Sequence, residues 1–168
     1  MAPYGPWSAA ALTSPDHVYA DVPYRIRGFR ALVSDPASTI DFDGSAHEAS
    51  LSRCAAVGGD GRLVVDADGE LVRATMVEKL LLIVAAKLVN LVPGGGIWMN
   101  TQRPEWNDAN NALVGRGVSV VSVAQLIGFV DQLTAMLERL PGDTALTVSG
   151  ALGTLWTELT HTLRTEQP

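Results

Sequence analysis

The segment Gly94–Gly117, GGGIWMNTQRPEWNDANNALVGRG, concentrates the side chains best suited to chemistry in this 168-residue chain. Its two carboxyl groups can each act as a general acid or base when they lie within reach of a substrate. Its arginine can hold a carboxylate or a phosphate. Indole rings next to amides suit a sugar, because the apolar face of a pyranose packs on an aromatic ring while its hydroxyl groups need donors and acceptors. These candidate residues are Trp98, Arg103, Glu105, Trp106 and Asp108.

Local signals predict that this segment is a constrained loop between helices. The residue before Pro104 is disfavoured in a helix, so residues 101–103 are expected to be extended. The glycine run Gly94–Gly96 allows the backbone to approach a neighbour closely, and loops on rigid elements often carry binding residues. A structural interpretation competes with the functional one. In it, Asn107 or Asp108 caps a following short helix by accepting backbone N–H bonds, and the tryptophans belong to the core.

Three apolar segments are expected to position this loop. Residues 75–92 predict a helix that starts at Thr75, with Glu78 at capping-box spacing, and that ends before Pro93. Residues 118–140 predict a second helix, and both helices are expected to be buried. Residues 144–165 predict a third, amphipathic helix that its glycines weaken.

The rest of the chain predicts less regular structure. Five prolines interrupt residues 1–45, which are therefore expected to form an irregular N-terminal segment with one short strand or helix in YRIRGFRALVS. Residues 62–73 carry β-branched side chains around Asp66-Ala67-Asp68-Gly69, a pattern typical of a small β-hairpin. The expected organisation is a mainly α-helical chain, with the irregular segment at residues 1–45 and a helical part at residues 46–168.

Composition excludes several classes of function. A net charge of −6 leaves no basic surface for nucleic acid. The single cysteine and three scattered histidines form no cluster at metal-ligand spacing, so no metal or organic cofactor is expected. The N-terminus lacks a basic start followed by an apolar run, and polar residues interrupt residues 118–140, so a cytoplasmic protein without a membrane span is expected.

The segment EWNDANNALVGRGVSVV resembles the catalytic stretch of the cellobiose-phosphorylase-like glycosidases, in which Trp-Asn-Asp is followed by an asparagine, a Val-Gly and an apolar helix. The resemblance covers residues 94–126. It implies an (α/α)6 toroid, a double ring of helices around a sugar site. It also implies that Asp108 is the general acid and that Trp106, Asn107 and Asn110 shape the substrate pocket.

A twelve-helix toroid needs roughly 190 residues before insertions, so the chain is expected to be part of such a toroid. The resemblance implies an inverting phosphorylase or hydrolase that acts on an oligosaccharide or glycoside. Inorganic phosphate would be the co-substrate of a phosphorylase, whereas a hydrolase would need a second carboxylate, for which Glu105 is the nearest candidate. Two alternatives stay open: a non-catalytic carbohydrate-binding module, and an inactive fragment that associates with itself or with a complementary chain.

Overall fold

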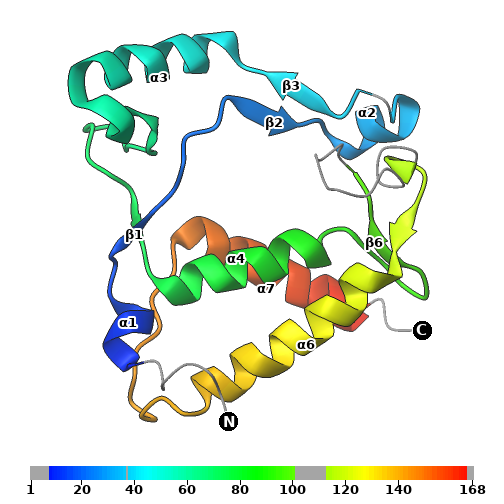
Figure 1. The fold of residues 1–168 in the computed structure, drawn as a ribbon. Helices are drawn as coiled ribbons and strands as arrows, with labels where there is room; N and C mark the ends of the chain where they lie inside the picture. Colours follow the sequence, from blue (N-terminus) through cyan, green and yellow to red (C-terminus); the bar gives the residue numbers. More distant parts are fainter. Residues whose placement is uncertain (1–7, 37, 101–112, 166–168) are drawn as a thin grey trace. The chain divides into compact units, whose positions relative to one another are not determined.

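The computed structural model describes residues 8–36, 38–100 and 113–165 (Figure 1). The contacts between residues divide the chain into two compact units, and each unit combines segments that are distant in the sequence. The first unit consists of Met1–His17, Arg73–Val89 and Val123–Pro168, and the second of Val18–Val72 and Asn90–Ser122.

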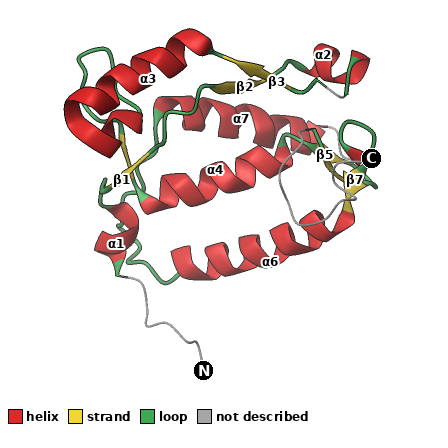
Figure 2. Cartoon of the chain, turned by 45° about the horizontal axis from the view of Figure 1, so that its top comes forward, coloured by secondary structure: helices red, strands yellow, loops and turns green. Residues whose placement is uncertain are grey.

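The first unit is built from helices. They are α1 (Ala9–Thr13), α4 (Met76–Leu88), most of α6 (Val120–Leu137) and α7 (Gly150–Thr165). Helix α4 contacts α1 and α7, and the two views show α4 and α7 side by side (Figures 1 and 2). The residues Val77, Val84 and Ala85 recur at the spacing that places side chains on one face of a helix, and all three are buried. Leu12, Leu133 and Leu152 complete this core from the other helices.

Helix α4 begins where its sequence predicts. The Thr75 hydroxyl accepts the amide of Glu78 (3.0 Å), which is an N-cap. The same hydroxyl donates to the Thr147 carbonyl (3.1 Å), and the Glu78 carboxylate accepts the amide of Ser149 (3.0 Å), directly before α7. Glu78 is only 6% exposed. The start of α4 therefore also fixes the start of α7, because an acidic side chain from one helix satisfies a free amide at the other.

We expect Glu78→Ala to lower the free energy of unfolding by about 2 kcal/mol, because the Ser149 amide loses a carboxylate acceptor and the buried position of Glu78 loses its side chain. Glu78→Gln retains an oxygen acceptor and should lose about half as much. Glu158→Ala is the matched control, since Glu158 is an exposed glutamate of α7. Urea unfolding followed by circular dichroism measures all three. A loss for Glu78→Ala no larger than that of the control would contradict this role.

The second unit alternates short strands with helices. Its elements include β2 (Tyr24–Ile26), α2 (Phe29–Ser34), β3 (Ile40–Phe42), α3 (Gly44–Val57) and the 3-10 helix η1 (Gly58–Arg62). The remaining strands of this unit are β5 (Leu91–Val92), β6 (Gly96–Trp98) and β7 (Val118–Ser119). A further short strand pair joins β1 (His17–Val18) to β4 (Arg73–Ala74).

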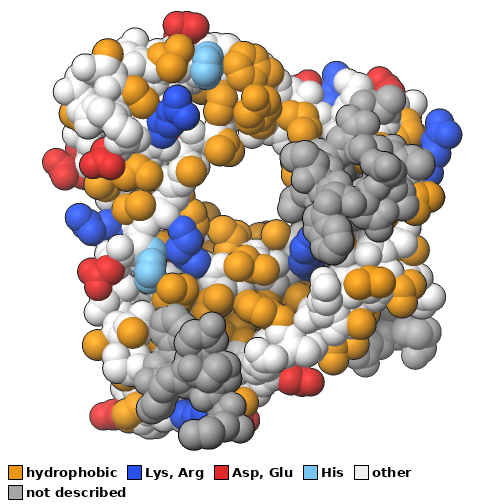
Figure 3. Space-filling model, viewed as in Figure 1, with side chains coloured by type: hydrophobic (Ala, Val, Ile, Leu, Met, Phe, Trp, Pro, Cys, Tyr) orange, Lys and Arg blue, Asp and Glu red, His pale blue; other side chains and the backbone are white. Residues whose placement is uncertain are grey.

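The antiparallel ribbon of β2 and β3 has two unlike faces. Tyr24 pairs with Phe42, and Ile26 pairs with Ile40. These four apolar side chains are exposed, and Figure 3 shows hydrophobic side chains gathered over this part of the unit. The intervening pair, Arg25 with Asp41, alternates with them and therefore points to the other face.

The prediction of a mainly α-helical, toroid-like array is wrong. Within the described residues, three small sheets, β1-β4, β2-β3 and β5-β6-β7, separate the helices, and none of these strands is longer than three residues. The N-terminal segment is not irregular either, because it contains α1, α2 and the first three strands. The helices α4, α6 and α7 do occur near their predicted positions. Prolines and glycines break the N-terminal segment into pieces too short to show a helical or strand period. The pieces are nevertheless ordered, because β2 pairs with β3, β1 pairs with β4 and α1 contacts α4. The boundary at residue 45 stays a prediction.

Helix α6 is less buried than its sequence predicts. Leu133 is its one buried residue, and Val120, Val121 and Ile127 are each more than half exposed. Among the described residues it is the one helix that is long and apolar enough to cross a membrane, and a helix from the core of a soluble protein would satisfy the same criteria. The cytoplasmic location stays a prediction.

Candidate functional site

The described beginning of the predicted chemical segment forms part of a three-stranded antiparallel sheet. Strand β6 is central and pairs with β5 on one side and β7 on the other. The glycine run forms the turn into β6, with Gly94 at a positive φ of 69°. Gly96 lies against the backbone of Ser119, where a side-chain carbon would be only 3.0 Å from the Ser119 carbonyl atoms. The prediction that this run permits a close backbone approach is therefore confirmed.

Hydrogen bonds join the residues that follow β6 to those that precede β7, and we call this paired region the base of the β6–β7 loop. Trp98 pairs with Val118 across the two strands. The Met99 amide donates to the Gly117 carbonyl (3.0 Å), and the Gly115 amide donates to the Met99 carbonyl (2.6 Å). This ladder holds the two ends of the intervening loop together.

Trp98 forms an aromatic pair at this base. Its ring contacts Phe29 of α2 edge-to-face, with 5.6 Å between the centroids. Phe29 is 69% exposed and Trp98 is partly exposed, so the pair lies at the surface of the second unit. A partly exposed indole held by a strand and by a second ring is a suitable stacking platform for an apolar ligand face. The contact of Phe29 with Trp98 could not be predicted, because nothing in YRIRGFRALVS indicates that this side chain meets a residue 69 positions later.

Two asparagines lie next to the aromatic pair. The Asn100 amide nitrogen donates to the Asn90 side-chain oxygen (3.0 Å), and the Asn90 carbonyl accepts the Trp98 amide (2.7 Å). Both side chains are partly buried. They are neutral amides joined to the Trp98 backbone through Asn90, and amides are the donors and acceptors that sugar hydroxyl groups require. Sequence analysis included Asn90 in the preceding helix, whereas α4 ends two residues earlier.

The remaining predicted site residues cannot be placed around this platform. Of the predicted set, Trp98 alone is described. The others lie outside the described residues, namely Arg103, Glu105, Trp106, Asn107, Asp108 and Asn110.

Two aspartates of the second unit serve local structure. The Asp41 carboxylate pairs with Arg27 at 3.0 Å. Asp43 caps α3 by accepting the Ala46 amide (3.0 Å) and the Ser45 hydroxyl (2.7 Å). These bonds, the Ala46 amide first, hold the pKa of Asp43 below its ordinary value. A carboxyl group that stays ionised suits a cap better than it suits a general acid.

In the described part of the chain, no group of three or more His, Cys, Asp or Glu side chains lies close enough together to hold a metal ion. No family model and no curated protein matches the chain.

Proposed function

We propose that the chain binds a carbohydrate at the base of the β6–β7 loop, with Trp98 as the stacking platform. The observation that carries this proposal is the partly exposed Trp98, which pairs with the exposed Phe29 and whose backbone is bonded to Asn90, the partner of Asn100. An apolar ring face flanked by neutral amides favours an uncharged polyhydroxylated ligand. The net charge of −6 agrees with a neutral ligand better than with an anionic polymer.

The loop that leaves this platform supplies the chemistry in our proposal. It carries Asp108, the general acid implied by the resemblance to cellobiose-phosphorylase-like glycosidases, which would protonate the glycosidic oxygen. Phosphate or water would then attack the anomeric carbon from the opposite face. A non-catalytic binding module is the competing function, and sugar affinity without product formation would identify it.

Trp98→Ala should weaken sugar binding about tenfold, because stacking and the burial of apolar area together contribute roughly 1–2 kcal/mol. Calorimetric titration with glucose, cellobiose and glucose 1-phosphate measures the affinity. Trp98→Phe should retain part of it, and Trp156→Phe, a change in α7 of the first unit, should leave it intact. If no sugar binds the wild-type protein, or if Trp98→Ala binds as tightly as wild type, the platform is not a sugar site.

A further inference from the structure

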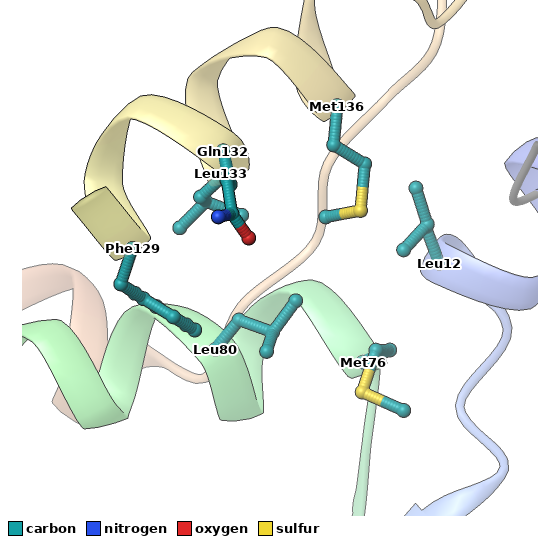
Figure 4. Close-up of a pocket in the computed structure, with 7 residues that line it drawn as sticks. All are labelled: Leu12, Met76, Leu80, Phe129, Gln132, Leu133 and Met136. Carbon is teal, nitrogen blue, oxygen red and sulfur yellow. The ribbon is translucent and has the colours of Figure 1, made fainter. Parts of the chain in front are cut away.

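The first unit contains an apolar pocket, whereas Trp98 belongs to the second unit. The pocket has a volume of about 260 Å³ and is lined by α1, α4 and α6 (Figure 4). Its apolar lining consists of Leu12, Met76, Leu80, Phe129, Leu133 and Met136. In the close-up, the α6 side chains point toward those of α4, and Leu12 closes one end. Leu12 and Leu133 are nearly inaccessible to solvent, so the floor of the pocket is fixed by the core.

Gln132 is the single polar residue among the described residues that line the pocket. It is an exposed residue of α6, and its side-chain amide points toward the space between the helices (Figure 4). No charged side chain is among the described residues that line the pocket. A charged ligand would lose its hydration there without gaining a counter-ion, so the pocket selects an uncharged one.

We propose that this pocket binds a neutral, planar aromatic molecule with one N–H or O–H group, such as an indole or a phenol. Two methionine thioethers and one phenyl ring favour an aromatic ring over an alkyl chain, because sulfur–aromatic and ring–ring contacts add to the burial of apolar area. The Gln132 amide oxygen accepts the hydrogen of the ligand. The volume is sufficient, since an apolar cavity of about 150 Å³ already holds benzene. This site is independent of the sugar proposal.

Methionine methyl groups provide the test. The protein is labelled with ¹³C at its four methionine methyl groups and titrated with indole. Met76 and Met136 line the pocket, and Met99 belongs to the other unit, so it is an internal control. We expect saturable ring-current shifts at Met76 and Met136 and an unchanged Met99 resonance. The substitutions Met76→Leu and Met136→Leu assign the two signals. No saturable shift, or an equal shift at Met99, would overturn the proposal.

A second ligand tests the proposed hydrogen bond between the ligand and the Gln132 amide oxygen. N-methylindole lacks the N–H group and should bind roughly three- to tenfold more weakly than indole, the factor of one net hydrogen bond. In Gln132→Leu the two ligands should bind equally. Gln125 is an exposed glutamine of α6 that is not in the lining given for the pocket, so Gln125→Leu should preserve the difference in affinity between indole and N-methylindole. Equal binding of the two ligands to the wild-type protein would overturn the role of Gln132.

Trp7 provides a further test, because the chain itself carries an indole one residue before Ser8, the N-cap of α1. Indole binding that occurs only after Trp7→Ala would mean that this side chain is the natural occupant. That result would overturn the proposal of an external ligand. Binding of equal strength in the wild type and in Trp7→Ala supports it.

Discussion

Gly115→Ala is expected to destabilise the second unit by about 3 kcal/mol or more. Gly115 has a positive φ of 72°, a conformation that costs an L-residue roughly 1–2 kcal/mol. An added Cβ would also overlap the Cβ of Pro36 and would lie 3.0 Å from its Cα. Overpacking of this kind typically costs a further 1–3 kcal/mol. Because the Gly115 amide closes the base of the β6–β7 loop, sugar affinity should fall together with stability.

Two controls separate the causes of this loss. Gly94 also has a positive φ, but its missing Cβ has open space around it, so Gly94→Ala measures strain alone, about 1–2 kcal/mol. The double variant Pro36→Gly/Gly115→Ala removes the Cβ that causes the overlap, and it should be more stable than Gly115→Ala. Thermal unfolding of the four proteins gives the comparison. Equal losses for Gly94→Ala and Gly115→Ala would show that the contact with Pro36 is unimportant.

The helices of the first unit could be predicted because their signals are local. The residues Val77, Val84 and Ala85 repeat at helical spacing, and Thr75 precedes them as an N-cap with a suitable side chain. Both features depend on residues within a few turns of one another. The bond from Glu78 to Ser149, 71 residues away, has no such signature, since spacing alone assigned Glu78 a role within its own helix.

The sheets could not be predicted for the opposite reason. Strands of two or three residues are too short to show an alternating period, and partners such as β1 and β4 or β6 and β7 are separated by many residues. Leu91 and Val92 continue the apolar composition of α4, so they were assigned to the helix, although they pair with β6. The toroid expectation came from the family resemblance, and the missed strands left the apolar segments as helices that agreed with it.

The candidate site also combines a feature that is visible in the local sequence with contacts that depend on tertiary structure. An indole close to a polar, glycine-bounded segment is visible in the sequence, and Trp98 is indeed a partly exposed residue at the base of that segment. Its neighbours Phe29 and Asn90 come from other elements, and the sequence offers no signal that they meet it. Chemistry-bearing residue types are thus predictable, whereas the set that gathers around a ligand depends on tertiary pairing.

Asp108→Asn is expected to lower the turnover of an ordinary glycoside by about 10²- to 10⁴-fold, the usual contribution of a general acid or base. This expectation rests on the proposed function. The asparagine has nearly the same size and can still hydrogen-bond to a sugar hydroxyl, so affinity should stay within about threefold of wild type. Product formation measured together with calorimetric affinity separates these two effects. Unchanged turnover would remove Asp108 as the acid.

Leaving-group dependence distinguishes an acid from a residue that only supports the site. A glycosyl fluoride needs far less protonation as its bond breaks, so Asp108→Asn should retain most of its turnover on that substrate while losing it on the alkyl glycoside. An equal loss on both substrates would indicate a structural role. Glu105→Gln then separates the two reaction types. It should abolish turnover if Glu105 activates water, and it should preserve turnover with inorganic phosphate if phosphate itself is the nucleophile, because a phosphorylase needs no second carboxylate.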